Sequence, residues 1–383
     1  MKVAMITCWF HNQVYGYYTD SLKSAIEDKI DGNVKIISSN CSCFTQSSGS
    51  LFKLKWNDLI NQEAHFARLP YLGDWPSKSR WKLYLRNTLR YPFEMSRGVL
   101  FLRASAGYHV VHFHQFLFSF GAPSAWSLLL LPSSKKRFIT IHEIDPIQNK
   151  HKSLNKIYNR ASAVIAHFHE IKRKLVELGV SEDKIKVVPY GTTISPLKGS
   201  KRAGAVFYGG HHLLIGKGFD DLLNALGHLK EAGKKIKVTI HGEFTGEDLR
   251  KGKTLAEGFG VGDYLEWPDR PIGQSVTDLY QRSLFCVIPF TKGSACYPVT
   301  TAMANGTPVI ATKRAGTQEY LGDLGIYIDI HSPVQLAERM ADLMDNPAIS
   351  AEYGPRMREK AIRFYSWDAV ANKTLELYRD SQQ

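Results

Sequence analysis

Short apolar runs alternate with amphipathic segments along the chain, and this alternation limits the fold more than any other feature of the sequence. The apolar runs have the length of strands, and the segments between them have the spacing of amphipathic helices. Such alternation is typical of parallel sheets with helices on both faces. The predicted strands are 2–7, 34–38, 109–113, 138–141, 163–166, 185–188, 205–208, 237–241, 286–289 and 308–311. The clearest predicted helices are 20–29, 171–178, 219–232 and 334–345.

The alternating pattern occurs twice, which predicts two doubly wound α/β domains. With 383 residues, the chain is long enough for two domains that each bury a core. A loop rich in Gly, Ser, Thr and Lys, residues 191–204, has the composition of an interdomain linker. We expect domains over 1–195 and 196–365 and a last helix within 366–383. Two such domains facing each other form a crevice at the carboxyl ends of their strands, where nucleotides usually bind.

The net charge of +13 lies entirely in the first half of the chain. Residues 1–200 hold 27 Lys and Arg against 14 Asp and Glu, whereas residues 201–383 hold 22 of each. The stretch 75–103 has seven basic residues, one acid and interleaved aromatic side chains, which fits docking on an anionic membrane surface. The candidate contacts are Trp81, Lys82, Arg86 and Arg90. The alternative is a solvated helix over the first sheet, and nucleic acid is disfavoured because no nucleic-acid-binding fold accompanies the charge.

The five cysteines form no disulfide framework, which favours a reduced, cytoplasmic compartment. The first residues are too short and too soon polar for a signal peptide. The longest apolar run, 116–131, is shorter than a membrane span and contains Gly121 and Pro123. We interpret this run as a core helix, and we expect the chain to be cytoplasmic, with peripheral contact to the inner face of a membrane.

A small-residue loop follows the predicted strand 286–289 and opens onto a predicted helix, 298–304. Free backbone N–H groups and the positive end of the helix dipole make such a loop suitable for phosphate. The candidate ligands are Gly293, Ser294 and Ala295. The alternative is a plain strand–loop–helix unit with no ligand.

A second glycine-rich passage, 208–226, follows the predicted strand 205–208. Gly209 and Gly210 end the strand, and Lys217 lies between two further glycines just before an amphipathic helix. Glycines allow a diphosphate to approach the backbone, and Lys217 would supply a point charge to a phosphate oxygen. The alternative is a solvated lysine at a helix start.

Histidines cluster at the ends of predicted strands in the first domain. His142 follows the strand 138–141, where it could bind a hydroxyl or transfer a proton. The pairs His112 with His114 and His167 with His169 have a two-residue spacing that suggests metal binding, but no third ligand is placed. We therefore expect no metal site, and the alternative for His142 is a hydrogen-bonded structural histidine.

Taken together, these passages resemble the nucleotide-sugar glycosyltransferases of family 4, also called group 1, which have the GT-B fold. The first strand with Gly16 is similar to the family's opening loop, and 366–378 to its final helix, which crosses back to the N-terminal domain. The other matching passages are 161–192 ("IPNG" in the family), 205–226 ("FVGR…KG") and 301–322 ("EAMACGTPVVAS…GGIPEV").

The resemblance implies a GT-B fold of two Rossmann-like domains and a metal-independent transferase of class EC 2.4. A UDP- or GDP-sugar would bind the C-terminal domain, and a saccharide or lipid-linked acceptor the N-terminal domain, in polysaccharide or glycoconjugate synthesis. Cleft closure would exclude water. Lys217 and the helix start at 293–295 would stabilise the leaving diphosphate. By the same resemblance, His142 would contact the donor sugar, and Gly16 would lie close to the diphosphate.

The sequence departs from the family at the paired glutamates spaced E-x7-E. Gly293 and Thr301 occupy these positions, and Thr301 is a weaker partner for a ribose hydroxyl than a carboxylate. The family's arginine falls on Gly210 or His211. We interpret the chain as a divergent transferase. The alternatives are a nucleotide-sugar epimerase of similar fold and a sugar-nucleotide-binding protein without catalysis.

Overall fold

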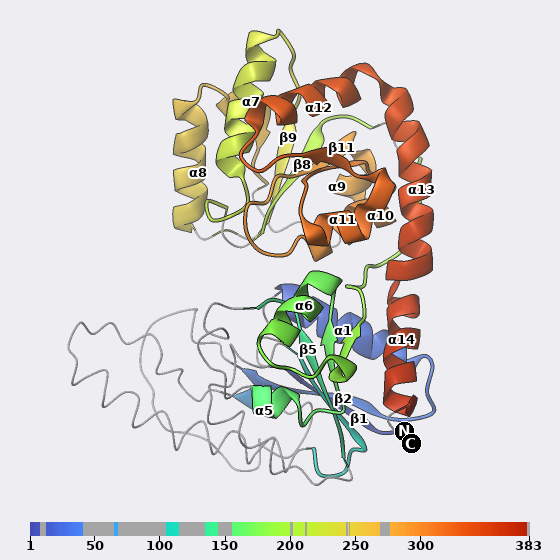
Figure 1. The fold of residues 1–383 in the computed structure, drawn as a ribbon. Coiled ribbons are helices and arrows are strands. Elements are labelled where there is room, and N and C mark those ends of the chain that lie inside the picture. Colours follow the sequence, from blue (N-terminus) through green and yellow to red (C-terminus); the bar gives the residue numbers. More distant parts are fainter. Residues whose placement is uncertain are drawn as a thin grey trace, which may run out of the picture. The chain divides into compact units, whose positions relative to one another are not determined.

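The computed structural model divides the chain into two compact units, each built from one sheet and its helices (Figure 1). Unit 1 comprises Met1–Pro189 and Val370–Gln383, and unit 2 comprises Tyr190–Ala369. The structure describes residues 1–7, 13–40, 65–67, 105–114, 135–144, 155–199, 202–210, 213–242, 244, 246–268 and 276–380.

The sheet of unit 1 is parallel throughout, with the order β3-β2-β1-β4-β5-β6-β7. The strand order reverses between β1 and β4, where Thr7 is in register with His114. The strands are β1 (Val3–Thr7), β2 (Val34–Asn40), β3 (His65–Ala67), β4 (Val110–His114), β5 (Lys136–Ile141), β6 (Ala163–Ala166) and β7 (Ile185–Val187). The helices are α1 (Gln13–Glu27), α5 (Asn155–Tyr158), α6 (His169–Glu177), the short 3₁₀ turn Glu182–Lys184 and most of α14 (Trp367–Asp380).

The sheet of unit 2 is also parallel and has the equivalent order, β10-β9-β8-β11-β12-β13. Its order reverses between β8 and β11. The strands are β8 (Ala205–Gly210), β9 (Val238–Gly242), β10 (Leu265–Glu266), β11 (Phe285–Ile288), β12 (Val309–Thr312) and β13 (Ile326–Ile328). The helices are α7 (Phe219–Glu231), α8 (Gly246–Gly258), α9 (Val276–Arg282), α10 (Cys296–Ala304), α11 (Ala315–Leu321), α12 (Pro333–Asp345) and α13 (Pro347–Tyr365), with 3₁₀ turns at Gly262–Tyr264 and Gly322–Leu324.

The central strands are buried along their whole length because helices cover both faces of each sheet. Every residue of β4, β6, β8, β11 and β12 is buried, which explains why these strands are continuous apolar runs in the sequence. In unit 2, side chains such as Leu222, Leu226 and Met340 on α7 and α12 pack into the same core as Phe207 and Val287. Each fully buried side chain of this kind stabilises the fold by about 1.5–3 kcal/mol.

The doubly wound class, the predicted strands and the four clearest helices are confirmed, with ends that shift by a few residues. Gly16 is an exception, because it lies inside α1 rather than in a loop. The predicted helix 298–304 begins two residues earlier, at Cys296. Pro298 is still in its first turn, where the missing N–H of proline costs no helical hydrogen bond.

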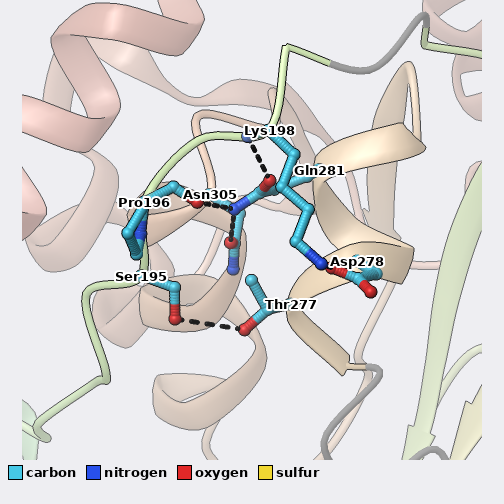
Figure 2. Close-up of polar contacts among 7 residues, drawn as sticks. All are labelled: Ser195, Pro196, Lys198, Thr277, Asp278, Gln281 and Asn305. Atoms are coloured by element: carbon cyan, nitrogen blue, oxygen red, sulfur yellow. Dashed lines mark hydrogen bonds and ion pairs between the residues drawn. The ribbon is translucent and has the colours of Figure 1, made fainter.

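The segment interpreted as an interdomain linker is fixed to unit 2 over its first half (Figure 2). Gln281 on α9 accepts a hydrogen bond from the backbone N–H of Lys198 at 3.0 Å and donates one to the carbonyl of Pro196 at 2.9 Å. The Gln281 amide also donates to the side chain of Asn305 at 3.2 Å. These bonds hold residues 196–198 to α9, and unit 2 begins at Tyr190, six residues before the predicted boundary.

The return of the chain to unit 1 also differs from the prediction. The backbone N–H of Thr192 donates to the carbonyl of Tyr365 at 2.8 Å, and Trp367 lies against Gly191. These contacts join the start of α14 to residues 191–192, and the first residues of α14 belong to unit 2, which ends at Ala369 and not at the predicted 365.

No helix in the described part of the chain has both the length and the apolar character needed to span a membrane. The apolar run 116–131 and the basic stretch 75–103, with Trp81, Lys82, Arg86 and Arg90, lie outside the described residues.

Candidate functional site

The reversal of strand order in unit 2 brings Lys217 over the end of β8. Gly210, the last residue of β8, has a positive φ of 64°, and a Cβ atom added there would lie 3.2 Å from Cε of Lys217. The ammonium group of Lys217 lies 4.1 Å from the ring centroid of Phe290, which follows β11. Lys217 therefore places a positive charge beside the carboxyl ends of β8 and β11, where doubly wound sheets bind their ligands.

Two glycines let the loop that carries Lys217 approach the loop after β11. A Cβ atom at Gly218 would lie 2.1 Å from the carbonyl oxygen of Pro289, and one at Gly216 would lie 2.7 Å from Cβ of Lys292. Both glycines have positive φ, 69° at Gly218 and 68° at Gly216. The carbonyl of Gly216 accepts hydrogen bonds from the backbone N–H groups of Thr291 and Lys292 at 3.0 and 3.1 Å. Glycine is required at both positions, because any side chain would push the two loops apart.

The loop after β11 leads to the N-terminus of α10, which no side chain caps. Gly293 has a φ of 77°, and the N-cap residue Ala295 makes no side-chain hydrogen bond to the first turn. Arg314, at the start of α11, donates a hydrogen bond from its guanidinium to the carbonyl of Thr291. With Thr291 held on both sides, the loop is positioned to present N–H donors at the positive end of α10 to an anion.

The structure therefore brings several predicted donor residues to one edge of the sheet of unit 2: Gly210, Lys217, Gly293, Ser294 and Ala295. Thr301 lies further along α10 and is 7% exposed, and its assignment to the ribose stays a prediction. His211 lies outside the described residues. The sequence reasoning overlooked Arg314 and Phe290, whose roles depend on contacts between loops far apart in the chain.

Unit 1 has a different group at its own strand ends, a buried cluster of four histidines around Tyr18. His112 and His114 come from β4, His142 follows β5 and His167 follows β6, and each is at most 3% exposed. The ring centroid of Tyr18, on α1, lies 4.7 Å from that of His142, 5.2 Å from that of His167 and 5.4 Å from that of His114. The repeated histidines at strand ends were the sequence signal for this cluster.

Burial keeps these imidazoles neutral. It lowers the pKa of His112 to about 3 and that of His167 to about 4, and it holds the pKa values of His114 and His142 well below the usual range, with neighbouring histidines adding to the effect. The cluster is therefore a set of neutral hydrogen-bonding groups at neutral pH.

The histidines of the cluster differ in their partners. His112 is bonded on both sides, at 2.6 Å to the hydroxyl of Tyr378 on α14 and at 2.7 Å to that of Thr140. His142 and His167 are bonded to each other at 2.8 Å. Within the described residues, neither ring nitrogen of His114 has a hydrogen-bond partner. His114, beside the strand reversal between β1 and β4, is thus a candidate ligand contact, whereas its spacing from His112 in the sequence suggested only a metal-binding pair.

The two histidine pairs differ in how their members are placed. His169 is exposed at the start of α6, away from the buried His167. Among the residues that the structure describes, the group with ligand atoms close enough for a metal ion is Asp220, Asp221 and His331, at the start of α7 and after β13. It includes no member of the histidine cluster.

Both halves of the chain match models of known families. Residues 200–364 match the model described as "Glycosyl transferases group 1", and residues 57–195 match "Glycosyltransferase Family 4". A curated relative, D-inositol 3-phosphate glycosyltransferase 2 of Catenulispora acidiphila, is 27% identical over 249 residues, which are 59% of this chain and 58% of the relative. The chain spans about half the length of the curated relatives it matches first.

Solved structures match over the full length of the chain. A glycosyltransferase from Rickettsia africae ESF-5 has a TM-score of 0.74 at 17% identity, covering 100% of this chain and 98% of that one. HepE from Anabaena, in complex with UDP and glucose, has a TM-score of 0.73 at 13% identity, covering 99% and 100%. These likenesses show the fold. With both family models matched in chain order on two Rossmann-like units, the chain belongs to the group 1 (family 4) glycosyltransferases of the GT-B fold.

Proposed function

We propose that the chain transfers a sugar from a nucleoside diphosphate sugar to a saccharide or lipid-linked acceptor, and that unit 2 binds the donor. The observation that carries this proposal is the position of Lys217 between Gly210 and Phe290, next to the loop that begins α10. A fixed cation beside an uncapped helix N-terminus suits a diphosphate.

In the proposed reaction, a hydroxyl oxygen of the acceptor bonds to the anomeric carbon and its proton is released, while the bond between the anomeric carbon and the diphosphate oxygen breaks and the diphosphate leaves with an added negative charge. Lys217 and the N–H groups at Gly293–Ala295 would stabilise that charge, and they are held in place before the reaction by Gly216, Gly218 and Arg314. Preorganised donors of this kind are typically worth a factor of about 10²–10³ each in rate. The proposed mechanism needs no metal ion, because protein groups supply the positive charge.

Two considerations guide the choice of donor and acceptor. The complex of HepE with UDP and glucose makes UDP-glucose the first donor to test, with GDP-sugars as the alternative. The absence of carboxylates at Gly293 and Thr301 favours a second candidate function, a protein that binds the sugar nucleotide without transferring the sugar. Turnover distinguishes the two functions.

The basic stretch 75–103 supports a proposal about the acceptor. Its excess of Lys and Arg, with aromatic side chains between them, suits an acidic or lipid-linked acceptor at the inner face of a membrane. The test is sedimentation of the full chain with anionic and with neutral liposomes at low salt. Binding to anionic liposomes alone would support the membrane proposal, and binding to neither would end it.

The main experiment is a thermal-shift screen with UDP, GDP, ADP and dTDP, followed by a donor-hydrolysis and transfer assay with the sugar of the nucleotide that binds. A nucleotide that binds the folded state raises the melting temperature. We expect one nucleoside diphosphate to stabilise the wild type and to lose its effect in Lys217→Ala. If all four nucleotides leave the wild type unchanged, the donor site proposed here is wrong.

A further inference from the structure

The C-terminus of α10, the helix whose N-terminus belongs to the proposed donor site, begins to close in the ordinary way. The backbone N–H of Thr307 donates to the carbonyl of Ala302 at 3.0 Å. The backbone N–H of Gly306 donates to the carbonyl of Met303, also at 3.0 Å, and Gly306 has a positive φ of 61°. These two bonds and the left-handed glycine form a Schellman motif. The motif itself supplies no donor for the carbonyls of residues 304–306.

Two arginines supply the donors for these three carbonyls. The guanidinium of Arg202, which precedes β8, donates to the carbonyl of Asn305 at 3.1 Å and to that of Gly306 at 2.8 Å. The guanidinium of Arg358, on α13, donates to the carbonyl of Ala304. Both side chains come from parts of the chain far from α10 in sequence, and both are half-buried. The negative end of the α10 dipole is therefore covered by two cations.

The other bonds of the two arginines go to uncharged oxygens. Arg202 donates to the carbonyl of Ser283 at 2.9 Å and to the hydroxyl of Thr307 at 3.2 Å. Arg358 donates to the carbonyl of Ser195 at 2.7 Å. Burial lowers the pKa of Arg202, but a guanidinium still keeps its proton at neutral pH. In the part of the chain that the structure describes, the end of α10 thus has two positive charges whose acceptors are neutral.

The distance between these charges and the N-terminus of α10 is short enough for an electrostatic effect. The helix has nine residues, which corresponds to about 13 Å, and all of them except Tyr297 are buried. Charges that act through a buried helix are screened less than charges that act through water. Because the arginines more than offset the half negative charge at the C-terminus, an anion at Gly293–Ala295 is attracted more strongly than by the helix dipole alone.

We propose that Arg202 and Arg358 are positioning residues of the donor site, which hold the C-terminus of α10 and add positive potential at its N-terminus, where the diphosphate of the donor binds. This inference rests on the function proposed above, in which unit 2 binds a nucleoside diphosphate sugar. A role confined to the stability of unit 2 would weaken the binding of all parts of the donor equally. A role of the charge would weaken the binding of the diphosphate and leave that of the nucleoside unchanged.

Two substitutions at each arginine separate charge from stability. Arg202→Gln and Arg358→Gln remove the charge, whereas Arg202→Lys and Arg358→Lys keep it and lose the fork of N–H donors. Arg282→Gln, which removes an exposed cation from α9, is the matched control. Circular dichroism and the melting temperature of each variant check that it is folded. Because two positions are tested, the failure of one variant to fold leaves the other to decide.

The measurement is isothermal titration of the full chain with UDP, with uridine and with inorganic pyrophosphate. Uridine has the base and ribose without the charge, and pyrophosphate has the charge without the nucleoside. We expect each Gln variant to raise the Kd of UDP and of pyrophosphate by about 3–10-fold and that of uridine by less than about 2-fold. The Lys variants should bind UDP and pyrophosphate nearly as well as the wild type, and Arg282→Gln should bind all three ligands as the wild type does.

Three results would overturn the inference: an unchanged Kd of pyrophosphate in a folded Gln variant, an equal loss of affinity for UDP and uridine, or Lys variants as weak as the Gln variants. If GDP binds in place of UDP, then GDP and guanosine are the nucleotide and nucleoside to compare. If the wild type binds pyrophosphate but no nucleoside diphosphate, the function proposed above fails, while the pyrophosphate affinities still decide the role of the arginines. A wild type that binds neither would overturn both.

Discussion

The two units share a strand order but differ in what they place where that order reverses. In unit 2 the reversal between β8 and β11 has glycines, an N-terminus of a helix and the cation of Lys217. In unit 1 the reversal between β1 and β4 lies beside buried neutral imidazoles and Tyr18. The same topology thus supports two kinds of chemistry.

The difference follows from what each set of groups can bind. Backbone N–H groups and the half-buried Lys217 can offset the charge of an anion, and their exposure to water does not destabilise the fold. Four imidazoles removed from water are neutral, and they can offer only ordinary hydrogen bonds. These properties support our proposal that unit 2 binds the diphosphate of the donor, and they suggest a test of whether unit 1 binds the hydroxyl groups of a sugar. This comparison can be tested at each of the two sites.

The largest effect is expected from removing the charge of unit 2. Lys217→Ala should lower kcat by about 10²–10³-fold, because the leaving diphosphate loses a fixed cation. The measurement is turnover with the donor found in the thermal-shift screen. Lys253→Ala, which removes an exposed lysine on α8, is the matched control and should leave turnover unchanged. Near-normal turnover of Lys217→Ala would show that the charge of Lys217 does not stabilise the leaving diphosphate.

Acid should destabilise unit 1 before unit 2. The unfolded chain protonates histidine near pH 6.5, whereas the folded pKa values of His112 and His167 are about 3 and 4. Below pH 6.5 the unfolded state therefore binds more protons, and the free energy of unfolding falls as pH falls. Each histidine that stays neutral contributes about 1.4 kcal/mol per pH unit to this fall.

Unit 2 provides the reference for that experiment. Among the residues that the structure describes, the buried histidine of unit 2 is His241, whose pKa burial lowers to about 4, against four in unit 1. Hydrogen exchange between pH 6.5 and 5 should show earlier loss of protection in β4–β6 than in β8–β11. Equal loss in the two sheets would mean that the histidine cluster is not the acid-sensitive element.

The glycines of unit 2 can be tested within one helix. Gly218→Ala should destabilise the fold by about 3 kcal/mol and abolish the thermal shift with nucleotide, because a Cβ atom would meet the carbonyl of Pro289 at 2.1 Å in a left-handed conformation. Gly227→Ala, inside α7, meets no atom within 4 Å and should stabilise the helix by about 0.5–1 kcal/mol. A Gly218→Ala variant as stable as the wild type would show that the two loops do not need their close approach.

The alternation of apolar and amphipathic segments was sufficient to predict the fold class and most of the strands. It did not reveal β3, β10 and β13, which are only two or three residues long and have too few positions for a pattern. Helix α13 was also overlooked, since Pro355 lies inside it and proline normally ends a helix. Elements with a long local sequence pattern were therefore predictable. The very short strands and the helix that contains a proline, which depend on packing, were not.

The candidate site shows the same division. Lys217 and the glycines around it were predictable because they are close together in the sequence, within residues 209–218. The role of Arg314 was not, because its partner Thr291 is 23 residues away and the contact exists only after both loops have folded. The pairing of His142 with His167 likewise depends on β5 and β6 being neighbours in the sheet.

The smallest expected change in stability is that of His114→Phe. Comparing this variant with His112→Phe separates a role in binding from a role in stability inside the histidine cluster. His112→Phe should destabilise the fold by about 2 kcal/mol, since the buried hydroxyls of Tyr378 and Thr140 each lose a partner. His114→Phe should destabilise the fold less than His112→Phe, because no hydrogen bond of His114 to a described residue is lost. Denaturant unfolding with turnover measured in parallel checks both variants.

His112→Phe should keep its turnover while it is folded, whereas His114→Phe should lose turnover if the strand reversal of unit 1 is where the sugar binds. A stable His114→Phe with full activity would show that the imidazoles of unit 1 serve only the core. In that case the reversal in unit 2 would be a binding site, whereas the residues at the reversal in unit 1 would only pack in the core. The shared strand order would then not by itself indicate a second binding site.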